Sequence, residues 1–302
     1  MMKALHPWVA LLVVLVVACS AQPTSMPTAE QPASPTVRAE GLAPTSETEI
    51  PSPPLATAAV SRELPTERGD HFAASGLCAT CHTNMVDRSG ADVSVDRHWR
   101  STMMANAARD PYWLASVRVE VLAHPDYQAV IEDKCATCHT PMGHFTAMAS
   151  GQEANLFGKG FLGPDHALRA LALDGVSCTL CHQIREAGFG EPGSFSGHYD
   201  IDSDSPMGRR AAFGPYPVRP GLVRMMQASS GFLAVESQHI EQSELCATCH
   251  TLYTPYVDDE GEIAGEFPEQ TPYLEWLESG FVRARSCQGC HMPQADGGVQ
   301  LS

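Results

Sequence analysis

A five-residue pattern, Cys-x-x-Cys-His, occurs five times in this 302-residue sequence. Ten of the eleven cysteines belong to it. The copies read CATCH, CATCH, CTLCH, CATCH and CQGCH, and they begin at positions 78, 135, 178, 246 and 287. Two thiols can form thioether bonds to the vinyl groups of a haem, and the imidazole that follows them can ligate its iron. This is the attachment pattern of c-type haem.

We therefore predict five covalently bound c-type haems. Zinc sites, redox dithiols and disulfides also use paired cysteines, but none of them needs histidine after every second cysteine. The predicted attachment residues are Cys78, Cys81, Cys135, Cys138, Cys178, Cys181, Cys246, Cys249, Cys287 and Cys290. The predicted ligands on the attachment side of each iron are His82, His139, His182, His250 and His291.

The second axial ligand of each iron must come from elsewhere in the chain. The preferred candidates for this distal position are His98, His124, His144, His166 and His239. His198 and His71 rank below them. Methionine is the alternative ligand and would raise the reduction potential; the candidates are Met103, Met104, Met142 and Met292. A supply of histidines this large favours two histidines on every iron.

The separations between motifs alternate between long and short, which favours one unit from the second and third motifs and another from the fourth and fifth. Five haems in so short a chain predict close haem packing, with covalent cofactors stabilising a small side-chain core. We expect a mainly α fold with long loops and little β. Helices are predicted from Pro111 after Asp110, over 126–134 and 165–174, and from Pro272 to Gly280. A long loop is predicted over 188–221.

The N-terminus predicts export. Lys3 precedes eleven apolar residues, 8–18, too few to span a bilayer but typical of a signal peptide over 1–19. Val16-Val17-Ala18-Cys19 resembles a lipobox, so Cys19 is a predicted lipidation site. Residues 20–66 contain nine prolines and no apolar periodicity, which predicts a disordered linker. The pentahaem domain is predicted over 67–302, in a lipoprotein of the periplasm or cell surface.

Four longer stretches resemble multihaem c-type cytochromes, including those of the c-552 and c-554 type. They read HWRSTMMANAARDPYW, DGVSCTLCHQI, SELCATCHTLYT and PYLEWLESGFVRARSCQGCHMP. That superfamily also contains nitrite reductases and hydroxylamine oxidoreductases. The resemblance implies closely packed haems in a multihaem cytochrome c fold, with two histidines on electron-transferring haems. Pentahaem nitrite reductases share a lysine as the proximal ligand of the catalytic haem, whereas every motif here ends in histidine. The chain stops soon after His291, which leaves room for a further C-terminal segment carrying another ligand.

The formal net charge of −16 argues against nucleic acid as a partner, and it suits either a basic protein partner or simply solubility. The leading hypothesis is an electron carrier, not an enzyme, that serves redox protein partners, with a membrane respiratory complex among the candidates. A second hypothesis is a haem enzyme acting on a small nitrogen or sulfur compound at one open iron, with His198, Tyr199 and Arg209 as pocket candidates. A third is a haem subunit of a respiratory complex or a cytochrome filament.

Overall fold

The computed structural model describes residues 64–292, 294–296 and 299. The predicted signal peptide, Cys19 and linker residues 20–63 lie outside the described residues. Within the described residues, no helix is long and apolar enough to cross a membrane. The α-helices there are α1 (Ser75–Ala79), α2 (Val95–Arg100), α3 (Met103–Asn106), α4 (Pro111–Ala123), α5 (Gln128–His139), α6 (Pro141–Ala149), α7 (Arg169–Leu173), α8 (Cys178–Cys181), α9 (Pro220–Ser230), α10 (Ser243–Ala247), α11 (Pro272–Leu277) and α12 (Cys287–His291).

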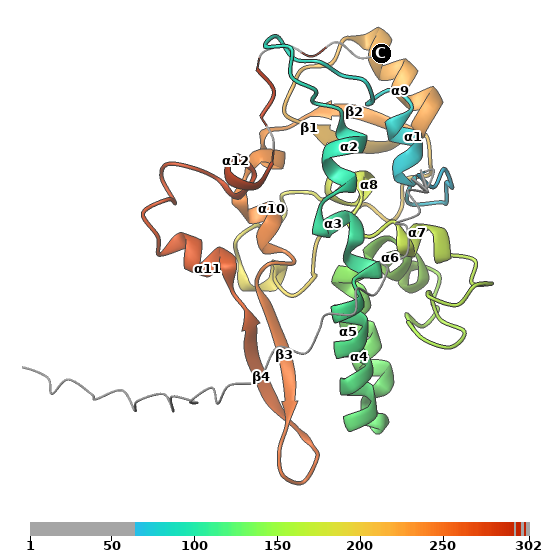
Figure 1. The fold of residues 1–302 in the computed structure, drawn as a ribbon, viewed down its shortest axis with the longest axis vertical. Helices are drawn as coiled ribbons and strands as arrows, with labels where there is room; N and C mark the ends of the chain where they lie inside the picture. The colour runs from blue at the N-terminus through green and yellow to red at the C-terminus, as the bar shows by residue number, and fades with distance from the viewer. Residues whose placement is uncertain (1–63, 293, 297–298, 300–302) are drawn as a thin grey trace, which may run out of the picture. The chain divides into compact units, whose positions relative to one another are not determined.

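The described residues also contain short 3-10 turns and four short strands (Figure 1). The turns are η1 (Ala107–Arg109), η2 (Pro125–Tyr127), η3 (Pro192–Ser194) and η4 (Gln238–Glu241). The strands are β1 (Arg210–Gly214), β2 (Phe232–Glu236), β3 (Leu252–Val257) and β4 (Ile263–Gln270). The chain is thus helix-rich with two small sheets, and long stretches such as 150–168 and 183–191 lack helices and strands.

The folded region begins earlier than the predicted boundary at residue 67. Gly76 in α1 donates a hydrogen bond to the carbonyl of Pro65 at 2.9 Å. A Cβ at Gly76 would lie only 2.7 Å from the carbonyl oxygen of Leu64, so the two segments are in close contact. Residues 64–66 therefore belong to the folded region, because the last predicted linker residues pack against α1.

Helix α4 begins where its capping signal predicts. The Asp110 carboxylate accepts a hydrogen bond from the amide of Tyr112 at 3.0 Å, and Pro111 occupies the first turn. Trp113, Val117 and Val121 are buried at a spacing of four, which forms one apolar stripe. This stripe packs in the cluster that contains Ala136 of α5, and it holds α5 in place.

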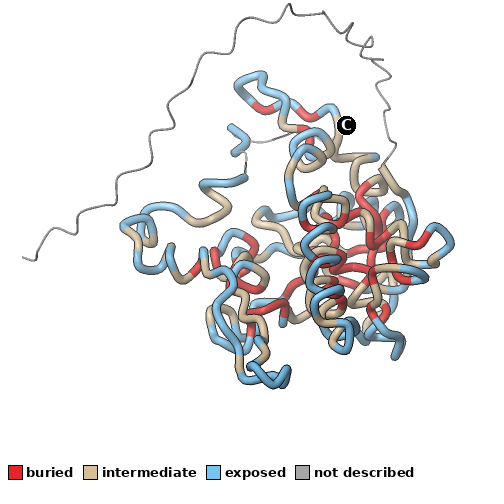
Figure 2. Tube along the Cα trace, turned by 60° about the horizontal axis from the view of Figure 1, so that its bottom comes forward, coloured by how far each residue is buried: buried red, intermediate tan, exposed pale blue. Residues whose placement is uncertain are grey.

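Two other sequence predictions differ from the structure. The stretch predicted as a loop over 188–221 contains β1 and the start of α9. Strand β1 pairs in parallel with β2, with Arg210 opposite Phe232. Helix α9 forms the crossover between the two strands. The helix predicted over 165–174 is restricted to α7, because 165–168 form turns. Figure 2 shows that the buried segments gather in one part of the molecule. In the β3–β4 hairpin, β4 is largely exposed and β3 is mostly of intermediate burial.

The buried carboxylate of Asp174 joins α7 to α1 and gives a pH prediction. Its Oδ2 and Oδ1 accept from the Ser75 amide at 2.8 Å and hydroxyl at 2.7 Å. Burial raises the pKa of Asp174, although the serine bonds oppose the shift. The stability that Asp174 contributes is therefore fully present below the ordinary carboxyl pKa of about 4 and is lost as pH rises through the raised pKa.

Urea unfolding across this pH range checks the sign. Asp174→Asn removes the titrating group. The free energy of unfolding of this variant should therefore rise relative to that of the native chain as pH rises above about 4. A constant difference between the two proteins at every pH would contradict the prediction.

Candidate haem-attachment sites

Each Cys-x-x-Cys-His motif lies in or at the end of a short helix. The amides of His82, His182 and His250 donate to the carbonyls of the first cysteine of their own motif, at 3.0, 3.1 and 2.8 Å. The second motif ends α5, and the fifth forms α12. In such a turn, residues i, i+3 and i+4 lie on one face. Both thiols and the imidazole of each motif are therefore presented together, as attachment of one haem requires.

Burial and neighbouring thiols shift the pKa values of the motif cysteines in both directions. The ten described cysteines are all free thiols. Burial raises the pKa values of Cys135 and Cys181 to about 12, so these thiols are protonated at neutral pH. The neighbouring thiols of Cys78 and Cys138 lower the pKa values of Cys178 and Cys249. Across the described part of the chain, no group of three or more His, Cys, Asp or Glu side chains is arranged to hold a bare metal ion.

Two motif histidines have the ring orientation of an iron ligand. Nδ1 of His139 lies 3.1 Å from the Ala107 carbonyl oxygen, and Nδ1 of His182 lies 2.5 Å from that of Phe213. A carbonyl oxygen only accepts, so Nδ1 must carry the proton in both rings. That tautomer leaves the Nε2 lone pair available for a metal, and such outer hydrogen bonds typically orient ligating histidines.

Trp113 supports the second motif in a way that the sequence alone did not indicate. Its indole lies parallel to the His139 ring, with centroids 4.3 Å apart and an interplanar angle of 1°. The stack fixes the ring plane, while the Ala107 carbonyl fixes its rotation. The site residues therefore fit a haem: two thiols, a correctly protonated imidazole and a side chain that holds it.

The thiols of the motifs meet in an order that differs from the chain order. The thiols of Cys78 and Cys178 are neighbours, and this proximity, together with burial, raises the pKa of Cys78. Cys138 and Cys249 form the same kind of pair, which raises the pKa of Cys138. The first motif therefore adjoins the third, and the second adjoins the fourth. The pairing of the second motif with the third, expected from spacing, stays a prediction.

The fourth motif also adjoins the fifth, in agreement with the pairing expected from spacing. Burial, followed by the nearby thiols of Cys287 and Cys181, raises the pKa of Cys246. The Cys287 amide donates to Ser243 Oγ at 3.0 Å, which fixes α12 against α10. Since Cys181 also influences Cys246, the third motif reaches the fourth. All five motifs thus form one continuous set of neighbours, with the fourth at its junction.

Tyr199 lies at the centre of this set. Its hydroxyl donates to the carbonyls of Thr137 at 3.3 Å and Pro141 at 3.5 Å. Burial raises the pKa of Tyr199 far above its usual value, with further contributions from the thiols of Cys249, Cys138 and Cys181. Its ring is therefore close to thiols of the second, third and fourth motifs, a position that the sequence did not reveal.

Three predicted distal histidines use Nε2 for hydrogen bonds to oxygen. In His98 it lies 2.7 Å from the Asp92 carbonyl, and in His239 it lies 2.8 Å from the Ile184 carbonyl. In His144 it lies 3.0 Å from the carboxylate of Asp133, on α5, the helix that carries the second motif. Each would have to release this bond to ligate iron. Their role as ligands stays a prediction, as does that of His124, which follows α4.

His71 gains weight as a candidate from the structure. Its Nδ1 is buried and has no hydrogen-bond partner among the described residues, and its ring packs edge-on against Phe145 with centroids 5.4 Å apart. His166 uses Nδ1 to accept from the Leu168 amide at 3.1 Å, which leaves Nε2 for a ligand. Met142 is fully buried and accepts from the Thr179 hydroxyl at 3.5 Å, as a packing residue does.

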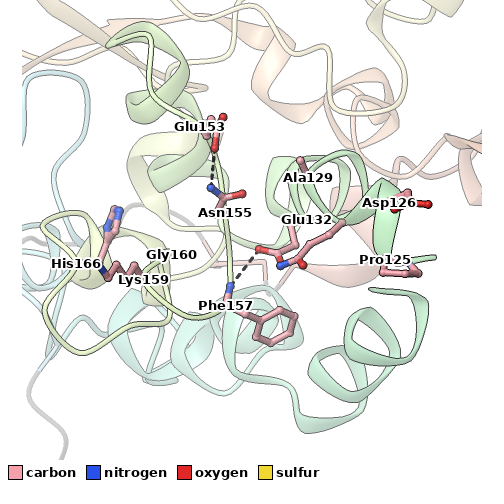
Figure 3. A pocket seen from close by; sticks show the side chains of 11 residues that line it. Pro125, Asp126, Ala129, Glu132, Glu153, Asn155, Phe157, Lys159, Gly160 and His166 are labelled. Carbon is pink, nitrogen blue, oxygen red and sulfur yellow. Dashed lines mark hydrogen bonds between the residues drawn. The ribbon is translucent and has the colours of Figure 1, made fainter. Parts of the chain in front are cut away.

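His166 also lines a surface pocket beside α5 (Figure 3). Glu132 lines this pocket. Its carboxylate accepts hydrogen bonds from the amides of Leu156 at 2.5 Å and Phe157 at 3.1 Å, and from the Gln128 side chain at 2.6 Å. These bonds anchor the loop that follows α6. Glu132 is thereby engaged in holding the loop and is poorly suited to act on a substrate.

The three residues that could have formed an enzyme pocket are not brought together. His198 and Arg209 are exposed, whereas Tyr199 turns inward to two backbone carbonyls. Neither the pocket of Figure 3 nor a second one beside Gly69 and Met207 is lined by any of the three.

Comparison with known proteins gives one distant likeness. No family model matches the sequence, and no curated protein matches it. A solved structure of a penta-heme cytochrome c552 from Thermochromatium tepidum is similar, with a TM-score of 0.44 and 19% identity. The similarity covers 76% of this chain and 56% of that chain. A likeness this distant does not place the chain in a family.

Proposed function

We propose that the protein is an extracytoplasmic multihaem c-type cytochrome that transfers electrons between redox partners through five covalently bound haems. The observation that carries the proposal is the continuous set of neighbouring motifs, from the first through the third to the fourth, and from there to the second and fifth. Cofactors attached to neighbouring motifs would lie close enough to act as one relay.

The chain's own residues would fix each cofactor and set its surroundings. The paired cysteines would anchor it, and the motif histidine would hold its iron, with His139 and His182 already oriented by carbonyl groups. A haem held in this way supplies reversible one-electron reduction of its iron. Burial around the motifs would limit water access, and the second axial histidine would occupy the remaining coordination position.

Export and anchoring complete the proposal. The signal peptide over 1–19 would deliver the chain across the membrane, and a lipid on Cys19 would tether it to a periplasmic or cell-surface leaflet. Its partners would then be redox proteins, with a membrane respiratory complex among them. The acidic charge suits basic partners and disfavours nucleic acid.

Electron paramagnetic resonance of the oxidised, haem-loaded protein at low temperature tests the carrier function. We expect only low-spin iron, because a second histidine on every haem leaves no open coordination position. A high-spin signal of about one iron per chain would contradict this expectation and would favour an enzyme acting at that open iron. An absorbance titration with cyanide is a second readout, and the carrier should show no binding.

A further inference from the structure

The β3–β4 hairpin is attached to α5 at both of its ends. At its base, the Gly197 amide donates to the Thr248 carbonyl at 2.6 Å, just before β3. A Cβ at Gly197 would lie 3.5 Å from the sulfur of Cys138, so this base adjoins the C-terminal end of α5. At its turn, the hydroxyl of Tyr127 donates to the Gly261 carbonyl at 2.9 Å, beside the N-terminal end of α5.

These two attachments place the hairpin alongside the helix. The 12 residues of α5 extend about 18 Å, and the 6 residues of β3 extend about 20 Å, so the lengths match. Figure 1 shows the hairpin and α4–α5 extending in the same direction. Helix α5 nevertheless packs on α4 and α6, whereas β3 and β4 pack chiefly on each other.

One face of the hairpin carries two aromatic rings and a carboxylate. Residues directly opposite in an antiparallel pair share a face, as do residues two apart in one strand. Thr254 lies opposite Phe267, and Tyr256 lies opposite Gly265. The Thr254 hydroxyl is hydrogen-bonded to the Glu269 carboxylate, which places Glu269 on the same face.

The attachments at Tyr127 and Gly197 set the hairpin beside the helix that ends in the second motif, and Glu269 marks the face nearer to that motif. After burial, the charge of Glu269 is the next largest contribution to the raised pKa of Cys135. Glu269 also favours the protonated form of His139, against the burial that lowers its pKa. Tyr256 and Phe267 are 47% and 45% exposed on the face that carries this carboxylate. Covering large aromatic surfaces is stabilising. A lone two-stranded hairpin is only marginally stable, so it needs such a cover.

We propose that this face of the β3–β4 hairpin forms a wall of the haem site of the second motif, where Tyr256 and Phe267 pack on the porphyrin held by Cys135 and Cys138. The inference rests on the proposed function, because it requires a haem at that motif. The apolar porphyrin supplies the partner that the exposed rings lack, and in return the hairpin shields the haem from water. The site thus draws on a segment that follows the fourth motif, more than a hundred positions along the chain.

Hydrogen exchange of the haem-loaded protein, followed by mass spectrometry, tests the proposal. A variant with Cys135→Ala and Cys138→Ala lacks the second haem, and its amides over 252–270 should exchange markedly faster. The matched control, Cys78→Ala with Cys81→Ala, lacks the first haem and should leave exchange over 252–270 unchanged. Unaltered exchange in the first variant, or equally fast exchange in both, would overturn the proposal.

A milder variant decides the matter if loss of the haem prevents folding. Phe267→Ala, with all haems retained, should admit water to one haem and lower the reduction potential of that haem alone. Met225→Ala removes a more exposed apolar side chain on α9 and should change no potential. Unchanged potentials in Phe267→Ala would refute the wall. The intact mass separates the failures: a native protein without a haem on the second motif contradicts the proposed function as well, whereas a haem indifferent to the hairpin contradicts this inference alone.

Discussion

Replacing Cys246 and Cys249 with alanine should isolate the fifth haem from the other three that remain. The reason is the position of the fourth motif, whose thiols adjoin those of Cys138, Cys287 and Cys181. The thiol of the fifth motif adjoins a thiol of the fourth, since Cys287 is bonded to Ser243 at the start of α10 and influences Cys246. Loss of the junction removes the cofactor through which electrons would pass between α12 and the rest.

Photoreduction followed by time-resolved absorbance measures this exchange. The native protein should equilibrate electrons among all haems in fast phases. The fourth-motif variant should show one haem that lags by orders of magnitude. The variant with Cys287→Ala and Cys290→Ala loses a terminal position, so its remaining four haems should equilibrate as in the native protein. Equal kinetics in both variants would show that the fourth motif is not the junction.

Arg210→Met should destabilise the folded chain severely. Arg210 is a fully buried cation, 2% exposed, at the start of β1. Its guanidinium donates to the carbonyls of Asp70 at 3.1 Å, Ser203 at 3.3 Å and Asp202, and to the Gln183 side chain at 3.3 Å. It thereby joins the segments around Asp70, Gln183 and Asp202.

Methionine keeps much of the volume of arginine but leaves these acceptors buried and unpaired. We expect the free energy of unfolding to fall by roughly 3–5 kcal/mol, because each unsatisfied buried group costs about 1–3 kcal/mol. The adjacent Arg209 is exposed, and Arg209→Met should change stability by no more than about 0.5 kcal/mol. Urea unfolding followed by far-ultraviolet circular dichroism measures both. If the two variants lose the same stability, the role assigned to Arg210 is wrong.

The local chemistry of the sites could be predicted from the sequence, whereas their neighbours in space could not. The Cys-x-x-Cys-His pattern predicts a helical turn at each motif because the pattern itself has helical spacing. The pairing of Cys78 with Cys178 skips a whole motif, and separation along the chain says nothing about such a return. Trp113 and the Phe213 carbonyl act on motif histidines from remote segments, so no local signal marks them.

The fold shows the same division. Capping by Asp110 and Pro111 is local, and the helix that it predicts starts at that point. Strands β3 and β4 carry no clear alternation that would predict them: β3 contains Pro255, β4 contains Pro268, and their side chains are intermediate or exposed. Strand β1 lies in a stretch rich in glycine and proline, and it is stabilised by the remote β2 and by the buried contacts of Arg210.

The intact mass of the exported protein, produced in a bacterium that attaches c-type haem, tests whether the chain carries five covalent haems. We expect a mass that exceeds that of the processed chain by five haem groups. Replacement of both cysteines of any one motif should remove one haem from that total. A mass that corresponds to the bare chain, or to fewer than five haems in a correctly folded protein, would contradict the pentahaem assignment.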